Sequence, residues 1–139
     1  MPIETRTLVV KSRSETDIID ITPEVQKLVS QSRIKEGSVL IFVKGSTASV
    51  STIEFEPNLV ADFKDCMERL VPSKIKYIHT ETWGDDNGKS HVRATLMGPG
   101  FTVPFKDKKL LLGTWQQIVL LDFDVPARER ELVVQVSGE

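Results

Sequence analysis

The sequence predicts an α+β fold, in which a mixed or antiparallel, sandwich-like β-sheet is packed by two main helices. Two segments carry apolar residues at helical spacing, and about eight shorter segments have the alternating or continuously apolar pattern of strands. The strand segments follow one another largely in hairpin order, which favours an α+β rather than an α/β architecture. Because the chain contains no linker, repeat or low-complexity stretch, we expect one domain spanning residues 1–139.

The two predicted helices have clear start signals. The first begins with Thr22 as N-cap and has Pro23 at its first helical position. The second begins at Pro57 and continues to about Leu70, before Pro72 ends it. The apolar residues of this second helix recur at the spacing of one helix face: Leu59, Val60, Phe63, Met67 and Leu70.

Strand patterns fill most of the remaining chain. Ser38–Val43 is a continuous β-branched and aromatic run, so we expect a central strand that is buried on both faces. Trp115–Phe123 is also apolar on both faces, which requires a cover such as a neighbouring subunit. Thr7–Val10 is expected to pair with Asp17–Ile21. The other predicted strands are Val50–Phe55, Ile75–His79, His91–Met97, Thr102–Phe105, Leu110–Leu112 and Leu132–Val136.

Composition argues against several classes of protein. The formal net charge is −2 and no basic run stands out beyond Lys106–Lys109, so no nucleic-acid partner is expected. No apolar stretch approaches the roughly 18 residues of a membrane span, so no membrane association is expected. The first ten residues lack the basic and apolar regions of a signal peptide, and the single cysteine, Cys66, suits a reducing compartment. We therefore expect a cytoplasmic protein.

Both histidines of the chain lie in one short window. His79 and His91 flank a turn-forming segment that contains Asp85, Asp86 and Asn87. Imidazole, carboxylate and amide groups bind metals, transfer protons and hold phosphate-bearing substrates. If the predicted strands on either side form a hairpin, the two imidazoles come within reach of each other. A solvated hairpin without a function fits the same spacing, so both interpretations stay open.

Two kinds of divalent metal site are compatible with these residues. His79 and His91, together with Asp86 or Glu54, would supply the three protein ligands of a catalytic zinc site. Magnesium would instead be held by the aspartates and a substrate diphosphate, because this ion needs few protein ligands. The sequence does not choose between zinc and magnesium.

The loop Gly45–Ser49 follows the predicted buried strand. Its small residues offer free backbone N–H groups and hydroxyls that are able to surround a phosphate, although the P-loop pattern is absent. A simple junction between two strands is the alternative interpretation.

Several motifs, taken in order along most of the chain, resemble one family. They are GSTASVSTIEFEPNLVADF, YIH after Pro72, W-x-D-D-N-G-x-x-H, L-x-G-P-G-x-x-V-P, LGTWQQIVLLDFD and R-x-R at Arg128 and Arg130. Together they resemble the YjbQ-like family of small proteins, whose members are described as secondary thiamine-phosphate synthases.

The resemblance implies an α+β fold, a homotrimer and a polar pocket that binds a metal or an anion. The residues that it implies for this pocket are His79, Asp86, Asn87 and His91, with the Gly45–Thr47 loop and Glu54. The implied activity joins hydroxymethylpyrimidine diphosphate to thiazole phosphate and releases pyrophosphate. Many members have a histidine where this chain has Gly45, so one imidazole that would serve as a third metal ligand is missing here.

The leading hypothesis is a cytosolic, homotrimeric transferase that acts on a small phosphorylated metabolite. His79 and His91 would act as proton donors or metal ligands. Asp86 and Glu54 would hold a divalent cation, Mg²⁺ or Zn²⁺. The groups expected to grip phosphate are Gly45, Ser46, Thr47, Asn87 and Arg128. The alternative is a non-catalytic trimer that binds a metal or a phosphometabolite.

Overall fold

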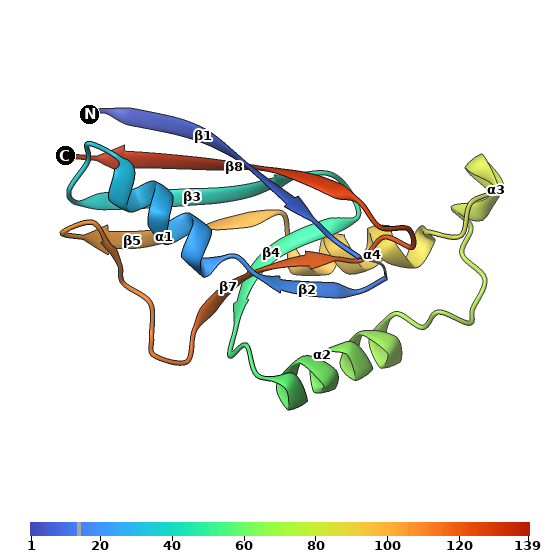
Figure 1. Cartoon of the computed structure of the whole chain (residues 1–139). Coiled ribbons are helices and arrows are strands. Elements are labelled where there is room, and N and C mark those ends of the chain that lie inside the picture. Colours follow the sequence, from blue (N-terminus) through green and yellow to red (C-terminus); the bar gives the residue numbers. More distant parts are fainter. Residues whose placement is uncertain (14) are drawn as a thin grey trace.

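The computed structural model describes residues 1–13 and 15–139, which form two antiparallel sheets with helices around them (Figure 1). The larger sheet consists, in spatial order, of β1 (Ile3–Lys11), β8 (Glu129–Gly138), β3 (Gly37–Lys44), β5 (Gly100–Lys106) and β6 (Lys109–Leu110). The smaller sheet consists, in the same sense, of β2 (Asp17–Asp20), β7 (Gln117–Asp122) and β4 (Ala48–Ile53). The helices are α1 (Thr22–Gln31), α2 (Pro57–Leu70), α3 (Thr80–Trp83) and α4 (Gly88–Met97). The predicted α+β class is therefore confirmed.

Both helices with strong sequence signals form as expected. α2 begins at Pro57, and the preceding Glu56 accepts a hydrogen bond from the Leu59 amide at 2.7 Å, which satisfies one free N–H of the first turn. α1 differs in one detail, because Thr22 is already helical and Ile21 occupies the N-cap position. The Thr22 hydroxyl instead accepts a hydrogen bond from the Ile118 amide at 2.8 Å and so ties the start of α1 to β7.

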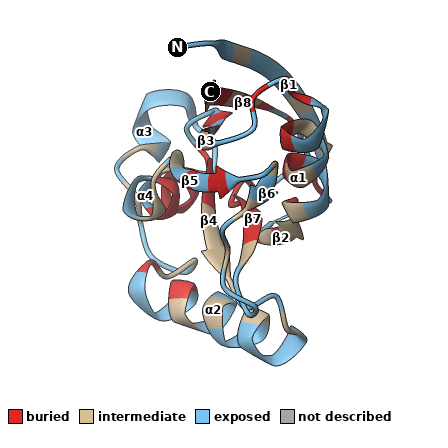
Figure 2. Ribbon diagram, turned by 90° about the vertical axis from the view of Figure 1, so that its left-hand side faces the viewer, coloured by how far each residue is buried: buried red, intermediate tan, exposed pale blue. Residues whose placement is uncertain are grey.

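β7 separates two hydrophobic clusters. On one face, Ile118 and Leu120 belong to the main core beneath the larger sheet. On the other face, Val119 and Leu121 pack with Met67, the one buried residue of α2, which is otherwise largely exposed in Figure 2. Each fully buried side chain of this kind contributes roughly 1.5–3 kcal/mol of transfer free energy. The two-sided apolar strand thus has the cover that was expected, and the chain's own elements supply it rather than a neighbouring subunit, which was one candidate.

Two strand predictions are corrected by the larger sheet. β3 is central, as predicted, but only Val39, Ile41 and Val43 are buried, whereas Leu40 is 36% exposed and Phe42 40% exposed. The outer face of this sheet is uncovered in the single chain, so burial on both faces was wrong. β1 does not pair with β2 but with β8, and β2 pairs with β7, because the chain crosses from one sheet to the other between them.

The largest correction concerns the segment around the second histidine. His91–Met97 was predicted as a strand but lies within α4, and Ile75–His79 forms turns rather than a strand. Alternation places Val92, Ala94 and Leu96 on one face, but the helix buries only Ala94 of these and leaves Val92 42% and Leu96 58% exposed. Seven residues are too few for periodicity alone to separate a strand from a helix. Gly98, with φ 88°, ends the helix in a conformation that favours glycine. The predicted hairpin across the DDNG segment therefore does not exist; that segment connects α3 to α4.

Within the described residues, no helix is long and apolar enough to cross a membrane.

Candidate functional site

Three connections, those between β1 and β2, between β3 and β4 and between β7 and β8, meet α4 at one end of the molecule, the right-hand end in Figure 1. The connection after β1 reaches the end of β7, where the Ser12 hydroxyl donates to Asp122 Oδ2 at 2.6 Å. The loop between β3 and β4 reaches the same place, where the Thr47 hydroxyl lies 3.3 Å from Asp124 Oδ2. The connection after β1 also reaches α4, because Lys89 forms an ion pair with Glu15. We call this region the histidine end, because it also carries both imidazoles.

The two imidazoles are in contact. The ring centroids of His79 and His91 lie 4.7 Å apart, with the ring planes inclined at 66°. His79 Nε2 lies 4.0 Å from Asp85 Oδ1, and the His79 side chain is 33% exposed. The predicted approach of the two rings is therefore confirmed, although a helix and a turn produce it rather than a hairpin.

Gly88 allows this approach. A Cβ atom at Gly88 would lie 2.6 Å from Cβ of Tyr77 and 3.4 Å from Cβ of His79. The first turn of α4 therefore packs directly on the segment that carries His79. Tyr77 is itself held by its hydroxyl, which donates to the Pro72 carbonyl at 2.6 Å. The distance between the imidazoles thus depends on the absence of a side chain at one position.

The start of α4 contains two unpartnered buried oxygen atoms. Among the described residues, Asn87 Oδ1 and Ser90 Oγ are buried without a hydrogen-bond partner. An unpaired buried polar group costs roughly 1–3 kcal/mol, so such atoms are few in folded proteins and indicate a missing partner. Asn87 was predicted as a site residue, whereas Ser90 was missed. Ser90 becomes recognisable only once the segment is known to be a helix, because its position in the first turn then carries meaning.

α4 is anchored by a buried arginine. Arg93 is 3% exposed, and its guanidinium donates to the Val71 carbonyl at 2.7 Å, to Thr16 Oγ1 at 3.3 Å and to Glu68 Oε2 at 3.1 Å. Hydrogen bonds from the Ser73 amide and hydroxyl, followed by that from Arg93, lower the pKa of Glu68 to about 2. The helix thus directs Arg93 into the interior, whereas His91 is only partly buried.

A buried cluster of acids and an arginine lies behind the β3–β4 loop. Asp122 and Asp124 are 2% and 3% exposed, and Arg130 is 7% exposed. Arg130 Nε and Nη2 both donate to Asp122, at 2.9 and 2.7 Å, and Nη2 also donates to Thr47 Oγ1 at 2.7 Å. Burial alone would raise the pKa of Asp122, but hydrogen bonds from Arg130, Ser12 and a backbone amide together hold this pKa below its ordinary value.

The sequence indicated this cluster only weakly. Asp122 and Asp124 end an otherwise apolar strand, and that change of polarity was the available signal. Arg128, the arginine expected to bind phosphate, has a half-exposed side chain whose Nε donates to Asp124 Oδ2 at 2.7 Å. Of these two arginines, Arg130 is the one that the fold buries.

The β3–β4 loop and α4 share a groove. An open depression of about 310 Å³ is lined by Gly45, Ser46, Ala48, Ala94, Thr95 and Pro99. The Thr95 hydroxyl donates to the His91 carbonyl at 2.8 Å, so the groove lies one helical turn from the imidazole pair. The structure therefore brings the loop predicted to hold phosphate close to the helix that carries His91.

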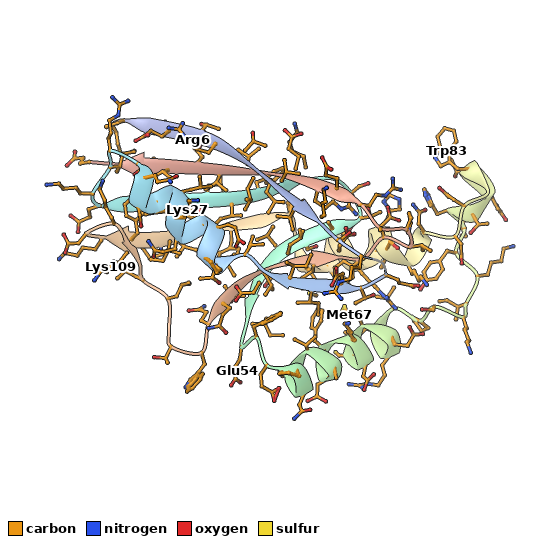
Figure 3. All side chains as sticks on the ribbon, viewed as in Figure 1. Arg6, Lys27, Glu54, Met67, Trp83 and Lys109 are labelled. Atoms are coloured by element: carbon orange, nitrogen blue, oxygen red, sulfur yellow. The ribbon has the colours of Figure 1, made fainter. Side chains whose placement is uncertain are left out.

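Glu54 is not part of this arrangement. It follows β4 at the opposite end of the smaller sheet and lines a separate depression with Trp115 and Gln117, next to the start of α2 (Figure 3). Asp86 is exposed. Within residues 1–13 and 15–139, no group of three or more His, Cys, Asp or Glu side chains is arranged to hold a metal ion. The donor set present therefore does not fit a resident metal with three carboxylate, thiolate or imidazole ligands.

Comparison with known proteins connects this arrangement to a family. The family model described as "UPF0047 protein YjbQ-like" matches residues 6–139. A UPF0047 protein of Archaeoglobus fulgidus is 37% identical over 126 residues, which cover 91% of this chain and 96% of that protein. A UPF0047 protein of Methanocaldococcus jannaschii is 33% identical over 131 residues, which cover 94% of this chain and 91% of that protein.

Solved structures show the same fold. A YjbQ-like protein of unknown function from Sulfolobus solfataricus superimposes with a TM-score of 0.93 at 32% identity, covering 99% of both chains. A hypothetical protein from Aeropyrum pernix gives a TM-score of 0.90 at 29% identity, covering 98% of this chain and 99% of that chain. The similarity therefore extends over the whole domain, including the histidine end.

Proposed function

Because this chain belongs to the YjbQ-like UPF0047 family, a family of uncharacterised function, we propose a role from the geometry of the histidine end. The chain binds a small phosphorylated metabolite in the groove between α4 and the Gly45–Thr47 loop and catalyses thiamine phosphate formation. The observation that carries this proposal is the contact of His79 and His91, with ring centroids 4.7 Å apart, one turn of α4 from Thr95, which lines the groove together with Gly45 and Ser46.

The chemistry of this reaction suits the groups present. The thiazole nitrogen forms a bond to the methylene carbon of hydroxymethylpyrimidine diphosphate, and the bond from that carbon to the diphosphate oxygen breaks. The electron pair leaves with the pyrophosphate, so the main demand on the protein is to stabilise negative charge on the leaving group. Imidazole N–H groups, backbone N–H groups and the start of α4 supply this without a covalent nucleophile.

A divalent cation enters this proposal with the substrate. Magnesium is commonly held by substrate phosphates and only one or two carboxylates. Asp85, 4.0 Å from His79, and the neighbouring Asp86 are the carboxylates closest in sequence to the start of α4. Zinc would require three protein ligands, so we propose magnesium carried by the diphosphate.

The proposed assembly is a cytoplasmic homotrimer. The uncovered outer face of the larger sheet supports self-association, because Val9, Leu40 and Phe42 are 53%, 36% and 40% exposed. An exposed group of apolar residues on one face of a sheet commonly marks a surface that packs against another protein. Sedimentation equilibrium of the purified chain measures the mass, and a monomer at micromolar concentration would contradict the trimer.

The activity is tested with the purified protein, both substrates and magnesium, with thiamine phosphate measured after oxidation to its fluorescent derivative. We expect product from the wild-type chain and at least a hundredfold less from His91→Ala, at the lower end of the usual range for general acid–base catalysis. Lys27→Ala, on the exposed face of α1, serves as the control and should retain the wild-type rate. Equal rates for wild type and His91→Ala would remove this histidine from the mechanism.

A non-catalytic binder is the second candidate. The buried Asn87 Oδ1 and Ser90 Oγ favour it, because each lacks a partner among the described residues and would gain from one that the chain itself does not supply. In that case a phosphometabolite raises the melting temperature of the protein, while no product forms from the two substrates. Thermal unfolding with and without pyrophosphate, run beside the activity assay, separates the two candidates.

A further inference from the structure

Arg130 is held in one orientation by the cluster behind the β3–β4 loop. Its Nε and one terminal nitrogen, Nη2, are both bound to Asp122, at 2.9 and 2.7 Å, and Nη2 also donates to Thr47 Oγ1. A guanidinium is planar, so fixing two of its three nitrogens also fixes the direction of the third. Arg130 therefore presents its remaining nitrogen, Nη1, at a defined place.

Nη1 is available for a ligand. No described residue accepts a hydrogen bond from it. It is also not sealed inside the protein, because the buried side-chain atoms that lack a partner among the described residues are Asn87 Oδ1 and Ser90 Oγ. An arginine that is 7% exposed thus keeps one edge, with two N–H donors, in contact with solvent.

That edge lies against Gly45. A Cβ atom at Gly45 would stand 3.0 Å from Arg130 Nη1, and this glycine has φ 156°, a conformation that side-chain-bearing residues rarely adopt. Gly45 also lines the groove together with Ser46 and Thr95. Because Gly45 has no side chain, the guanidinium edge reaches the groove; any larger residue at this position would cover it.

The β3–β4 loop beside Nη1 adds further hydrogen-bond donors, whereas the carboxylates of Asp122 and Asp124 lie 2.7 and 3.9 Å from the other terminal nitrogen, Nη2. The backbone N–H groups of Gly45, Ser46 and Thr47 donate to no acceptor among the described residues. Successive free N–H groups beside a guanidinium form a concave site with partial and full positive charge. Phosphate oxygens are the acceptors that match such a set, since charge-assisted N–H···O bonds to phosphate are the strong ones. A cationic or purely apolar ligand would leave every one of these donors unpaired.

We infer that Arg130 and the Gly45–Thr47 loop form a phosphate-binding subsite, which the bare Cα of Gly45 opens to the groove. The ligand class is the phosphate or diphosphate group of a small metabolite. The identity of the whole substrate rests on the function proposed above, but the binding of phosphate by these groups does not. Arg128, the arginine expected from the sequence, is held only at its Nε, by Asp124, and its half-exposed side chain is not fixed in one orientation as that of Arg130 is, so we do not include it in the subsite.

Binding of inorganic phosphate and of pyrophosphate is measured by titration calorimetry on the full chain. We expect Arg130→Gln and Gly45→Ala each to weaken pyrophosphate binding by at least about tenfold, as the loss of a charge-assisted contact does. Arg128→Gln removes the same charge two residues away and should change the affinity less than about threefold. Lys109→Gln, on the opposite side of the molecule in Figure 3, is the control for net charge.

Arg130→Gln leaves Asp122 without its buried partner and carries a risk of misfolding, so two further measurements keep the inference open to refutation. Gly45→Ala leaves the Arg130–Asp122 pair intact. Amide shifts of Gly45, Ser46 and Thr47 in the wild-type chain, followed by ¹H–¹⁵N spectroscopy during addition of pyrophosphate, require no variant. We expect these three amides to move first.

The outcomes separate this inference from the proposed function. Pyrophosphate binding that depends on Arg130 and Gly45, without any thiamine phosphate formed, supports the subsite and rejects the reaction. Turnover that is lost in His91→Ala but unchanged in Gly45→Ala and Arg130→Gln supports the reaction and overturns the subsite. The absence of phosphate and pyrophosphate binding at millimolar concentration, or an equal loss in Arg128→Gln, also overturns it.

Discussion

The two ends of the smaller sheet are built differently. At the histidine end, Asp122, Asp124 and Arg130 are all less than 10% exposed and are joined by hydrogen bonds. At the opposite end, which we call the tryptophan end, Trp115 is 73% exposed and Phe55 is 43% exposed around a depression of about 480 Å³. β4 and β7 connect the two ends, so one sheet carries both.

This difference shows where the fold fixes functional groups in position. Buried charges are costly unless they are paired, so a buried arginine with one free edge is held rigidly and oriented. The exposed carboxylate of Glu54 at the tryptophan end has no comparable constraint. Chemistry that requires defined geometry is therefore expected at the histidine end rather than at the tryptophan end.

The largest effect is expected from Asp122→Asn. Removing the charge of one partner of a buried ion pair typically costs about 3–5 kcal/mol of unfolding free energy, because the other charge is left uncompensated. Glu54→Gln, at the tryptophan end, should change the unfolding free energy by no more than about 0.5 kcal/mol. Urea unfolding at pH 7 measures both. Similar values for the two variants would contradict the difference between the ends.

The same pair predicts a pH dependence. The pKa of Asp122 is lowered in the folded chain, so its contribution to stability is present above the ordinary carboxyl pKa and is lost as the pH falls through the lowered one. The difference in stability between wild type and Asp122→Asn should therefore be full at pH 6 and shrink towards pH 2. Urea unfolding at a series of pH values provides the measurement. A difference that stays constant with pH would reject this role for the carboxylate.

The third prediction compares the effect on catalysis of one substitution at each end, His91→Ala and Glu54→Gln. We expect the first to lower kcat/KM for thiamine phosphate formation at least about a hundredfold, and the second less than about threefold. The reason is that His91 contacts the second imidazole and lies one helical turn from Thr95 of the groove, whereas Glu54 lines a separate depression. Steady-state kinetics on both purified variants measures the two values of kcat/KM. An equal loss would mean that the two ends act together, as they would if they belonged to neighbouring subunits.

Gly88→Ala and Gly113→Ala compare the packing at the two ends. A Cβ at Gly88 would lie 2.6 Å from Tyr77 Cβ, whereas one at Gly113 would meet nothing closer than 3.6 Å. Gly88→Ala should destabilise the chain by about 1–3 kcal/mol and move the imidazoles apart, as overpacking does. Gly113→Ala should be within about 0.5 kcal/mol of wild type. Thermal unfolding measures the change in stability, and NMR resonances of the histidine rings report the separation of the imidazoles. Equal stabilities of the two variants would contradict the tight contact at Gly88.

The smallest effect is expected from Glu68→Gln. Glu68 is exposed, and hydrogen bonds from Ser73 and Arg93 lower its pKa to about 2. Its contribution is thus present above the ordinary pKa of 4.5 and disappears as the pH falls towards 2. We expect a slightly lower melting temperature for the variant at pH 7 and no difference at pH 2. A larger difference at pH 2 than at pH 7 would reverse the sign and reject the assignment.

Elements with local signals were predictable, and those that depend on distant partners were not. α2 begins at Pro57 and ends at Leu70 as expected, because its cap and its apolar stripe lie within one segment. α4 was taken for a strand because Val92, Ala94 and Leu96 alternate, although the helix leaves Val92 and Leu96 exposed. Strand pairing was also missed, because nothing near β1 in the sequence specifies β8 as its partner.

The candidate site was predictable in part for the same reason. His79 and His91 are close in sequence, and a short connection keeps them close in space whichever structure it adopts. Arg130 and Thr47 are 83 residues apart, and Ser12 and Asp122 are 110 apart, so only the assembled sheets bring these groups together. Glu54 was placed with the histidines, but β4 carries it to the other end of the sheet.

The sequence by itself determined the α+β class, the two main helices and the grouping of the histidines, because each depends on interactions within one short stretch of chain. The tertiary structure decided that a helix carries His91, that Arg130 rather than Arg128 is buried behind Gly45, and that Glu54 lies away from both. These features follow from long-range strand pairing, since a buried charge is stable only where its partner, contributed by another part of the chain, is already in place.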